Sequence, residues 1–139
     1  MGDPIFIAGP TASGKSATAV EIGKKKEGEI ISVDSMQIYK SLDIGTAKPT
    51  TEERAAVEHH LVDAIELDQA FNAARFVSLT SALIAKIKQP IFCGGTGLYF
   101  QAWLQGLGES PGGSAVLRAE LEEMDMELLL AELQQKDPV

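Results

Sequence analysis

The sequence predicts an α/β fold, in which helices flank a largely parallel sheet. Short apolar runs alternate with longer amphipathic stretches over the first hundred residues, as expected for strands joined by crossover helices. A glycine-rich turn joins the first apolar run to the first amphipathic stretch, a pattern typical of phosphate-binding loops. Beyond residue 114, two acidic amphipathic segments predict helices at the C-terminal end.

The first fifty residues predict strand, helix, strand and loop. Pro4–Ala8 is an apolar run that stops at a glycine, as a buried strand does. Ser16–Lys26 has apolar residues at helical spacing and three lysines in its last turn, where positive charge favours the helix dipole. Glu29–Val33 is a second expected strand. Residues 34–50 are rich in Asp, Ser, Gly, Pro and Thr, which predicts a loop with a short turn at Met36–Tyr39.

The next elements continue the alternation. Thr51–Val57, with two glutamates in its first turn, is a short helix candidate, and His60–Ile65 is expected to be a third strand. Phe71–Lys88 predicts a longer amphipathic helix, because apolar residues recur at three- and four-residue spacings. Pro90–Cys93 predicts a strand that leads through a glycine-rich turn into a helix over Leu98–Gln105.

The clearest internal linker is Gly106–Ser114, which is rich in Gly, Pro and Ser. We therefore expect an α/β core in residues 1–106, and in residues 107–139 a linker followed by helices over Ala115–Glu123 and Met126–Gln135. The acidic run between residues 120 and 127 predicts a solvated helix face.

Composition narrows the classes of protein. The chain has 139 residues and a net charge of −8. The first fifty residues hold six basic and six acidic side chains, and the remainder holds six and fourteen, so the acidic excess lies in the second part. No strongly basic groove is evident. The absence of a long apolar stretch, of a signal-like N-terminus and of more than one cysteine predicts a cytoplasmic protein without a membrane span.

A complete P-loop pattern, G-x-x-x-x-G-K-S, follows the first strand and opens the first helix. Its glycines let successive backbone N–H groups point at a polyphosphate, which the helix N-terminus also attracts. The lysine places a cation on the terminal phosphate, and the serine hydroxyl can bind Mg²⁺. The alternative is a glycine-rich turn without a ligand. The predicted phosphate-binding residues are Gly9, Pro10, Thr11, Ala12, Ser13, Gly14, Lys15 and Ser16, with Ser16 as the metal ligand.

Two polar residues follow other strands at the same expected edge of the sheet. Asp34 has a functional interpretation, as a general base or a group near the metal, and a structural one, as a helix N-cap; its position alone leaves these open. Thr96 either binds an anion or caps a tight turn. His59 and His60 are adjacent and point to opposite sides of a strand, so we expect structural histidines. Cys93 is expected to be a buried small hydrophobe.

Five blocks of sequence together resemble the tRNA dimethylallyltransferase family, in the family's order and spacing. They are Gly9–Ser16, Ile31–Lys40, Leu42–Pro49, His60–Asp63 and Gly94–Phe100. The resemblance implies transfer of a dimethylallyl group from dimethylallyl diphosphate to the exocyclic amine of an adenine beside the tRNA anticodon. That adenine must leave its stack to reach such a pocket.

The resemblance also implies roles for individual residues. The P-loop would hold the diphosphate, with Mg²⁺ as cofactor. Asp34 would accept the amine proton, and Thr96 would act beside it in catalysis. The residues expected to contact tRNA are Asp34, Ser35, Met36, Gln37 and Arg118.

Members of this family are about twice as long as this chain, within the usual size of a two-domain enzyme. The resemblance therefore implies an incomplete catalytic core in residues 1–106 and, in residues 107–139, the helical start of a tRNA-binding insertion. We expect a shortened form that turns over poorly or not at all alone, and a monomer. The alternatives are an adenylate isopentenyltransferase, a small P-loop kinase and an inactive phosphate-binding fragment.

Overall fold

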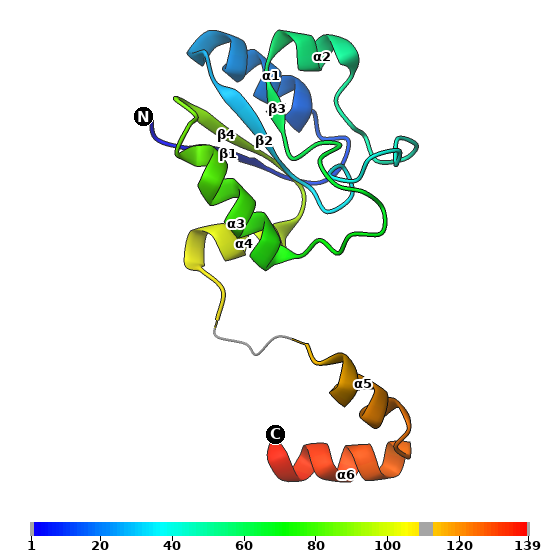
Figure 1. Cartoon of the computed structure of the whole chain (residues 1–139). Helices are drawn as coiled ribbons and strands as arrows, with labels where there is room; N and C mark the ends of the chain where they lie inside the picture. Colours follow the sequence, from blue (N-terminus) through cyan, green and yellow to red (C-terminus); the bar gives the residue numbers. More distant parts are fainter. Residues whose placement is uncertain (1, 109–112, 139) are drawn as a thin grey trace. The chain divides into compact units, whose positions relative to one another are not determined.

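A four-stranded, wholly parallel sheet organises the first part of the chain (Figure 1). The computed structural model describes residues 2–108 and 113–138. Its strands are β1 (Ile5–Ala8), β2 (Glu29–Val33), β3 (His59–His60) and β4 (Pro90–Gly94), in the order β1-β4-β2-β3. The predicted α/β class with a parallel sheet is confirmed.

Helices cover both faces of this sheet (Figure 1). Helix α1 (Lys15–Lys26) packs on one face, and α3 (Ala73–Ile84) and α4 (Gly97–Gln105) pack on the other. Alternate residues of the strands therefore enter two separate apolar clusters. The fully buried members on the α3 and α4 face include Ile31, Val33, Phe76 and Phe92, and those on the α1 face include Ala19 and Ile91.

The strand register brings three loops to one edge of the sheet. Gly94, the last residue of β4, lies opposite Ala8 of β1 and opposite Val33 of β2. A Cβ at Gly94 would come within 2.0 Å of the Val33 carbonyl oxygen, so the close approach of these strands requires glycine. The segments that begin after Ala8, Val33 and Gly94 consequently start side by side.

Two predicted elements are shorter in the structure than expected. The strand predicted over His60–Ile65 is wrong beyond its first residue, because Leu61 and Asp63 adopt left-handed backbone conformations, with φ of 59° and 51°, that end the ladder. The helix predicted over Phe71–Lys88 begins after the Asn72 cap and ends at Ile84. Helix α2 (Thr51–Ala56) agrees with prediction and starts with a capping box at Thr50.

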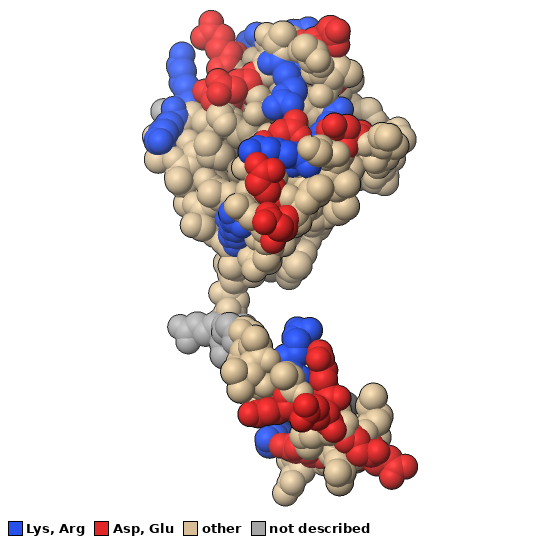
Figure 2. All heavy atoms as spheres, turned by 45° about the vertical axis from the view of Figure 1, so that its right-hand side comes forward, with Lys and Arg blue, Asp and Glu red and all other residues tan. Residues whose placement is uncertain are grey.

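The chain divides into two compact units, Met1–Leu107 and Gly108–Val139. The second contains helices α5 (Ala115–Glu122) and α6 (Met126–Lys136), close to the predicted bounds. The predicted acidic run is exposed, and acidic side chains are prominent on the face of this unit seen in Figure 2. Part of the predicted linker, residues 109–112, lies outside the described residues. Within the described ranges, every helix is too short or too polar to cross a bilayer.

Candidate functional site

The P-loop connects β1 to α1, as the sequence predicts. Gly14 directly precedes the helix with a φ of 82°, a left-handed conformation that glycine adopts without steric cost. Ala12 is also left-handed, with a φ of 63°. The Lys15 ammonium donates a hydrogen bond of 2.5 Å to the carbonyl oxygen of Pro10, so its charge lies against the loop.

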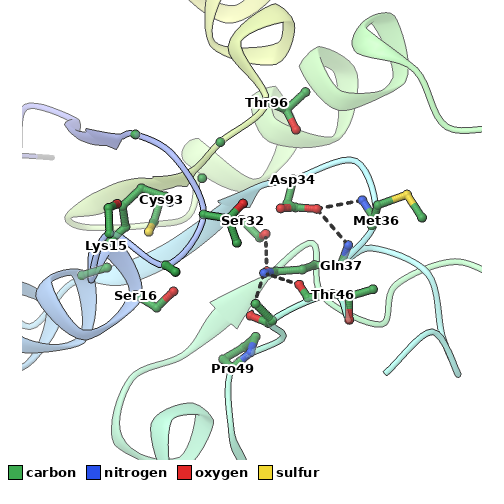
Figure 3. A pocket seen from close by; sticks show the side chains of 18 of the residues that line it. Lys15, Ser16, Ser32, Asp34, Met36, Gln37, Thr46, Pro49, Cys93 and Thr96 are labelled. Atoms are coloured by element: carbon green, nitrogen blue, oxygen red, sulfur yellow. Dashed lines mark hydrogen bonds between the residues drawn. The ribbon is translucent and has the colours of Figure 1, made fainter. Parts of the chain in front are cut away.

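A pocket of about 870 Å³ lies at the carboxyl ends of the strands, within the size range of small-molecule sites. All eight predicted phosphate-binding residues line it, as do Asp34, Ser35, Met36, Gln37 and Thr96. Figure 3 shows Lys15 and Ser16 on one side of this pocket and Asp34 and Gln37 on the other. The structure therefore brings together every predicted site residue of the first unit.

Asp34 caps a turn and not a helix, because no helix begins between β2 and α2, and its role as a base stays a prediction. Its Oδ1 accepts hydrogen bonds from the backbone N–H groups of Met36, at 2.8 Å, and Gln37, at 3.2 Å, as an Asx turn does. Within the described part of the chain, its second carboxylate oxygen has no hydrogen-bond donor. One oxygen thus holds the side chain in place, and the other can accept a proton or a ligand's hydrogen bond.

Thr96 holds two of the three loops together and does not cap its own helix. Its Oγ1 accepts a hydrogen bond of 3.2 Å from the backbone N–H of Ser35, and its backbone N–H donates to the Val33 carbonyl oxygen at the same distance. The cap interpretation is wrong, because the side chain makes no hydrogen bond to the N-terminus of α4. The hydroxyl hydrogen is left to donate to a bound ligand.

The side-chain amide of Gln37 is almost fully hydrogen-bonded within the protein (Figure 3). Its Nε2 donates to the carbonyl oxygens of Thr46, at 3.1 Å, and Ala47, at 2.9 Å, while its Oε1 accepts from the Ser32 hydroxyl at 2.9 Å. Both amide hydrogens are therefore used, and one lone pair of Oε1 is left. Direct contact of Gln37 with tRNA stays a prediction, restricted to that acceptor.

Oxygen ligands suited to Mg²⁺ line the pocket. Ser16 is exposed at the first turn of α1, and Asp34 offers a carboxylate from the loop after β2. A different group, Glu29, Glu58 and His60, has potential ligand atoms within 4.8 Å of one another. It lies at the opposite end of β2 from the P-loop, and its Glu29 carboxylate already pairs with His60 at 2.7 Å.

Several lining residues were not predicted as site residues. His59, Cys93 and Ser32 line the pocket, together with residues 45–47 and Pro49. Cys93 is buried, as predicted, and burial raises the pKa of its thiol despite the nearby Lys15 charge. Burial also lowers the pKa of His59, whose Nδ1 lies 2.8 Å from the Val57 carbonyl oxygen. The two-residue alternation of β2 could have indicated Ser32, which shares a face with Asp34.

Arg118 lies on α5, in the second unit. Its side chain lines a shallow groove between α5 and α6 together with Leu117, Leu121 and Leu129. Its predicted contact with tRNA stays a prediction.

The sequence profile of the IPP transferase family matches residues 37–139. The chain is 52% identical over 127 residues to a tRNA dimethylallyltransferase of Anaeromyxobacter sp. strain Fw109-5, covering 88% of this chain and 42% of that protein. It is 48% identical over 142 residues to tRNA dimethylallyltransferase 1 of Pelobacter propionicus, covering 96% and 46%.

Solved structures agree with the sequence matches. The full-length tRNA isopentenylpyrophosphate transferase of Bacillus halodurans aligns with a TM-score of 0.74 and 39% identity, over 98% of this chain and 48% of that one. A eukaryotic dimethylallyltransferase acting on tRNA aligns with a TM-score of 0.81 and 29% identity, over 99% and 36%. The chain spans less than half the length of these relatives. The family profile matches from Gln37 onward, and the P-loop that lines the pocket precedes the matched residues. The chain belongs to the IPP transferase family.

Proposed function

We propose that the pocket binds dimethylallyl diphosphate and that the chain acts in transferring the dimethylallyl group to an adenine amine of tRNA. The observation that carries this proposal is the shared pocket of the P-loop, Asp34 and Thr96. A phosphate-binding loop alone fits any polyphosphate. A carboxylate oxygen and a hydroxyl hydrogen facing the same pocket are the groups that an amine nucleophile and an oxygen leaving group need.

In the proposed reaction, the exocyclic nitrogen of adenine attacks the allylic carbon that carries the diphosphate. A carbon–nitrogen bond forms while the carbon–oxygen bond breaks, and the electron pair leaves with the diphosphate. The second carboxylate oxygen of Asp34 takes the proton that the amine loses. Lys15 and the N–H groups of the P-loop stabilise the negative charge of the leaving diphosphate.

Mg²⁺ belongs to the same proposal. The Ser16 hydroxyl would hold it, with diphosphate oxygens and water completing an oxygen shell. When bound, the ion neutralises charge on the diphosphate. We expect diphosphate affinity to fall by at least about tenfold when EDTA replaces millimolar Mg²⁺. A tenfold change in the dissociation constant corresponds to about 1.4 kcal/mol of binding free energy. Equal affinity with and without the metal would contradict the cofactor assignment.

Calorimetry can test the donor. The chain is titrated with dimethylallyl diphosphate, ATP and pyrophosphate in separate experiments. Preference for dimethylallyl diphosphate over ATP supports the proposal, whereas preference for ATP would favour a small P-loop kinase. Equal binding of dimethylallyl diphosphate and pyrophosphate would indicate a phosphate-binding module that does not recognise the allylic group.

Labelled donor can test the acceptor. The chain is incubated with labelled dimethylallyl diphosphate and either an anticodon stem–loop RNA, the same RNA with guanine in place of the adenine beside the anticodon, or AMP. Label in the adenine-containing RNA alone supports the proposal. Label in AMP alone would identify an adenylate isopentenyltransferase instead.

A further inference from the structure

We propose that Lys48 is a positioning residue that holds the 42–49 loop, and through it Gln37, as one wall of the pocket that receives the acceptor adenine. The inference rests on the proposed function for the identity of the acceptor. Lys48 itself does not line the pocket, whereas Thr46, Ala47 and Pro49, its neighbours on the loop, do.

The side chain of Lys48 is largely covered, and its ammonium has three hydrogen-bond acceptors. Its side chain is 8% exposed. The ammonium donates to the backbone carbonyl oxygen of Tyr39 at 2.7 Å, to Asp43 at 2.8 Å and to Asp63 at 2.5 Å. All three donor hydrogens of the ammonium are thereby used, so its geometry is fully determined by the protein.

These contacts fasten the loop to the fold at both of its ends. The ion pair of Lys48 with Asp43 joins the two ends of residues 43–48. The ion pair of Lys48 with Asp63 connects this loop to the segment after β3, where Arg54 also pairs with Asp63 at 2.6 Å. Burial by itself lowers the pKa of Lys48, but the hydrogen bonds and charges of Asp43 and Asp63 outweigh it, so the pKa is raised and the side chain stays charged at neutral pH.

The loop, once fastened, determines how Gln37 is presented. The amide of Gln37 donates to the carbonyl oxygens of Thr46 and Ala47, and Ala47 adopts a left-handed conformation with a φ of 49°. A loop released by Lys48 would lose this conformation, and the two acceptors of Gln37 with it. Figure 3 shows Gln37, Thr46 and Pro49 on the same side of the pocket, away from Lys15. Lys48 should therefore affect the acceptor and leave the diphosphate site unchanged.

The first test measures solvent exchange of the Gln37 side-chain amide by NMR, with the signal assigned from its loss in Gln37→Glu. We expect Lys48→Met to speed this exchange about ten- to a hundredfold, the change that losing a hydrogen bond to a charged group produces. Pyrophosphate affinity in Mg²⁺ should stay within about twofold. Lys40→Met is the matched control, because Lys40 pairs with Glu66 through largely exposed side chains and should change neither quantity.

A second variant covers the case in which Lys48→Met does not fold. Asp43→Asn removes a partner whose side chain is 71% exposed, so the fold should tolerate it. It should speed amide exchange in the same direction by a smaller factor. Unchanged exchange in a folded Lys48→Met chain, or in Asp43→Asn if the first variant does not fold, would overturn the inference. Loss of pyrophosphate binding in folded Lys48→Met would also overturn it, because Lys48 would then act on the whole site.

The transfer assay separates this inference from the proposed function. In Lys48→Met we expect a raised KM for the stem–loop RNA and an unchanged KM for dimethylallyl diphosphate, a split that general destabilisation would not produce. If the unaltered chain neither prefers dimethylallyl diphosphate in calorimetry nor transfers the label to RNA, the proposed function fails, while the amide-exchange result still decides whether Lys48 positions Gln37.

Discussion

Replacement of Lys15 by alanine should weaken diphosphate binding without unfolding the chain. Lys15 is the first residue of α1, and its ammonium lies against the P-loop through the Pro10 carbonyl oxygen. A bound diphosphate offers that ammonium a charged acceptor in place of a neutral one. The resulting charge-assisted hydrogen bond is shorter and roughly twice as strong as a neutral one.

The magnitude follows from the contact that is lost. A hydrogen bond to a charged group contributes about 1.5–3 kcal/mol, and each 1.4 kcal/mol changes an equilibrium constant tenfold. The dissociation constant for pyrophosphate or dimethylallyl diphosphate should therefore rise roughly ten- to 150-fold. Folding stability should change by less than about 1 kcal/mol, because no deeply buried group loses its partner.

Isothermal titration calorimetry provides the measurement, with Lys24→Ala as the matched control. Lys24 is exposed on the same helix, about 14 Å further along its axis at 1.5 Å per residue, so its removal should leave affinity unchanged. Unchanged diphosphate affinity in a folded Lys15→Ala chain would refute the assignment of Lys15 to the phosphate. An equal loss in both variants would indicate a general effect of positive charge on α1.

Three further outcomes are expected. Asp34→Asn should keep the Asx turn and donor affinity but slow dimethylallyl transfer about 10²–10⁴-fold, the usual contribution of a general base; a rate within a few-fold of the unaltered chain would leave Asp34 as a turn residue only. Gly94→Ala should lower the melting temperature and weaken donor binding, because its Cβ would collide with the Val33 carbonyl oxygen and separate β4 from β2; an unchanged melting curve would contradict the close approach. Hydrogen bonds and charges from Lys48 and Arg54 lower the pKa of Asp63 despite its partial burial. As the pH falls, the Asp63 carboxylate of the unfolded chain therefore binds a proton before that of the folded chain does. The stabilisation from Asp63 is thus present above about pH 4 and is lost as the pH falls through the lowered pKa. Urea unfolding at a series of pH values should show this loss in the free energy of unfolding. The Asp63→Asn variant should lose less stability over the same pH range.

The sequence alone determined the features that depend on neighbouring residues. The P-loop, its preceding strand and its following helix form one continuous pattern, so the strand–loop–helix arrangement could be predicted without knowledge of the remaining fold. Asp34 and Thr96 were also identifiable, because polar residues directly after parallel strands meet at one edge of the sheet. The strand register confirms that reasoning, with Val33 and Gly94 directly opposed.

Only the tertiary structure decided how the loop after β2 is held. Lys48 and Asp63 are fifteen residues apart, and no periodicity in the sequence relates them. The left-handed conformations of Leu61 and Asp63, which end β3 early, accompany hydrogen bonds from residues 63–65 to the carbonyl oxygens of Gln37 and Ile38. Such contacts form between segments that folding brings together, and their energies outweigh the local β-propensity of an apolar run. For the same reason, the sequence showed that Gln37 is near the site but not that its amide is already used.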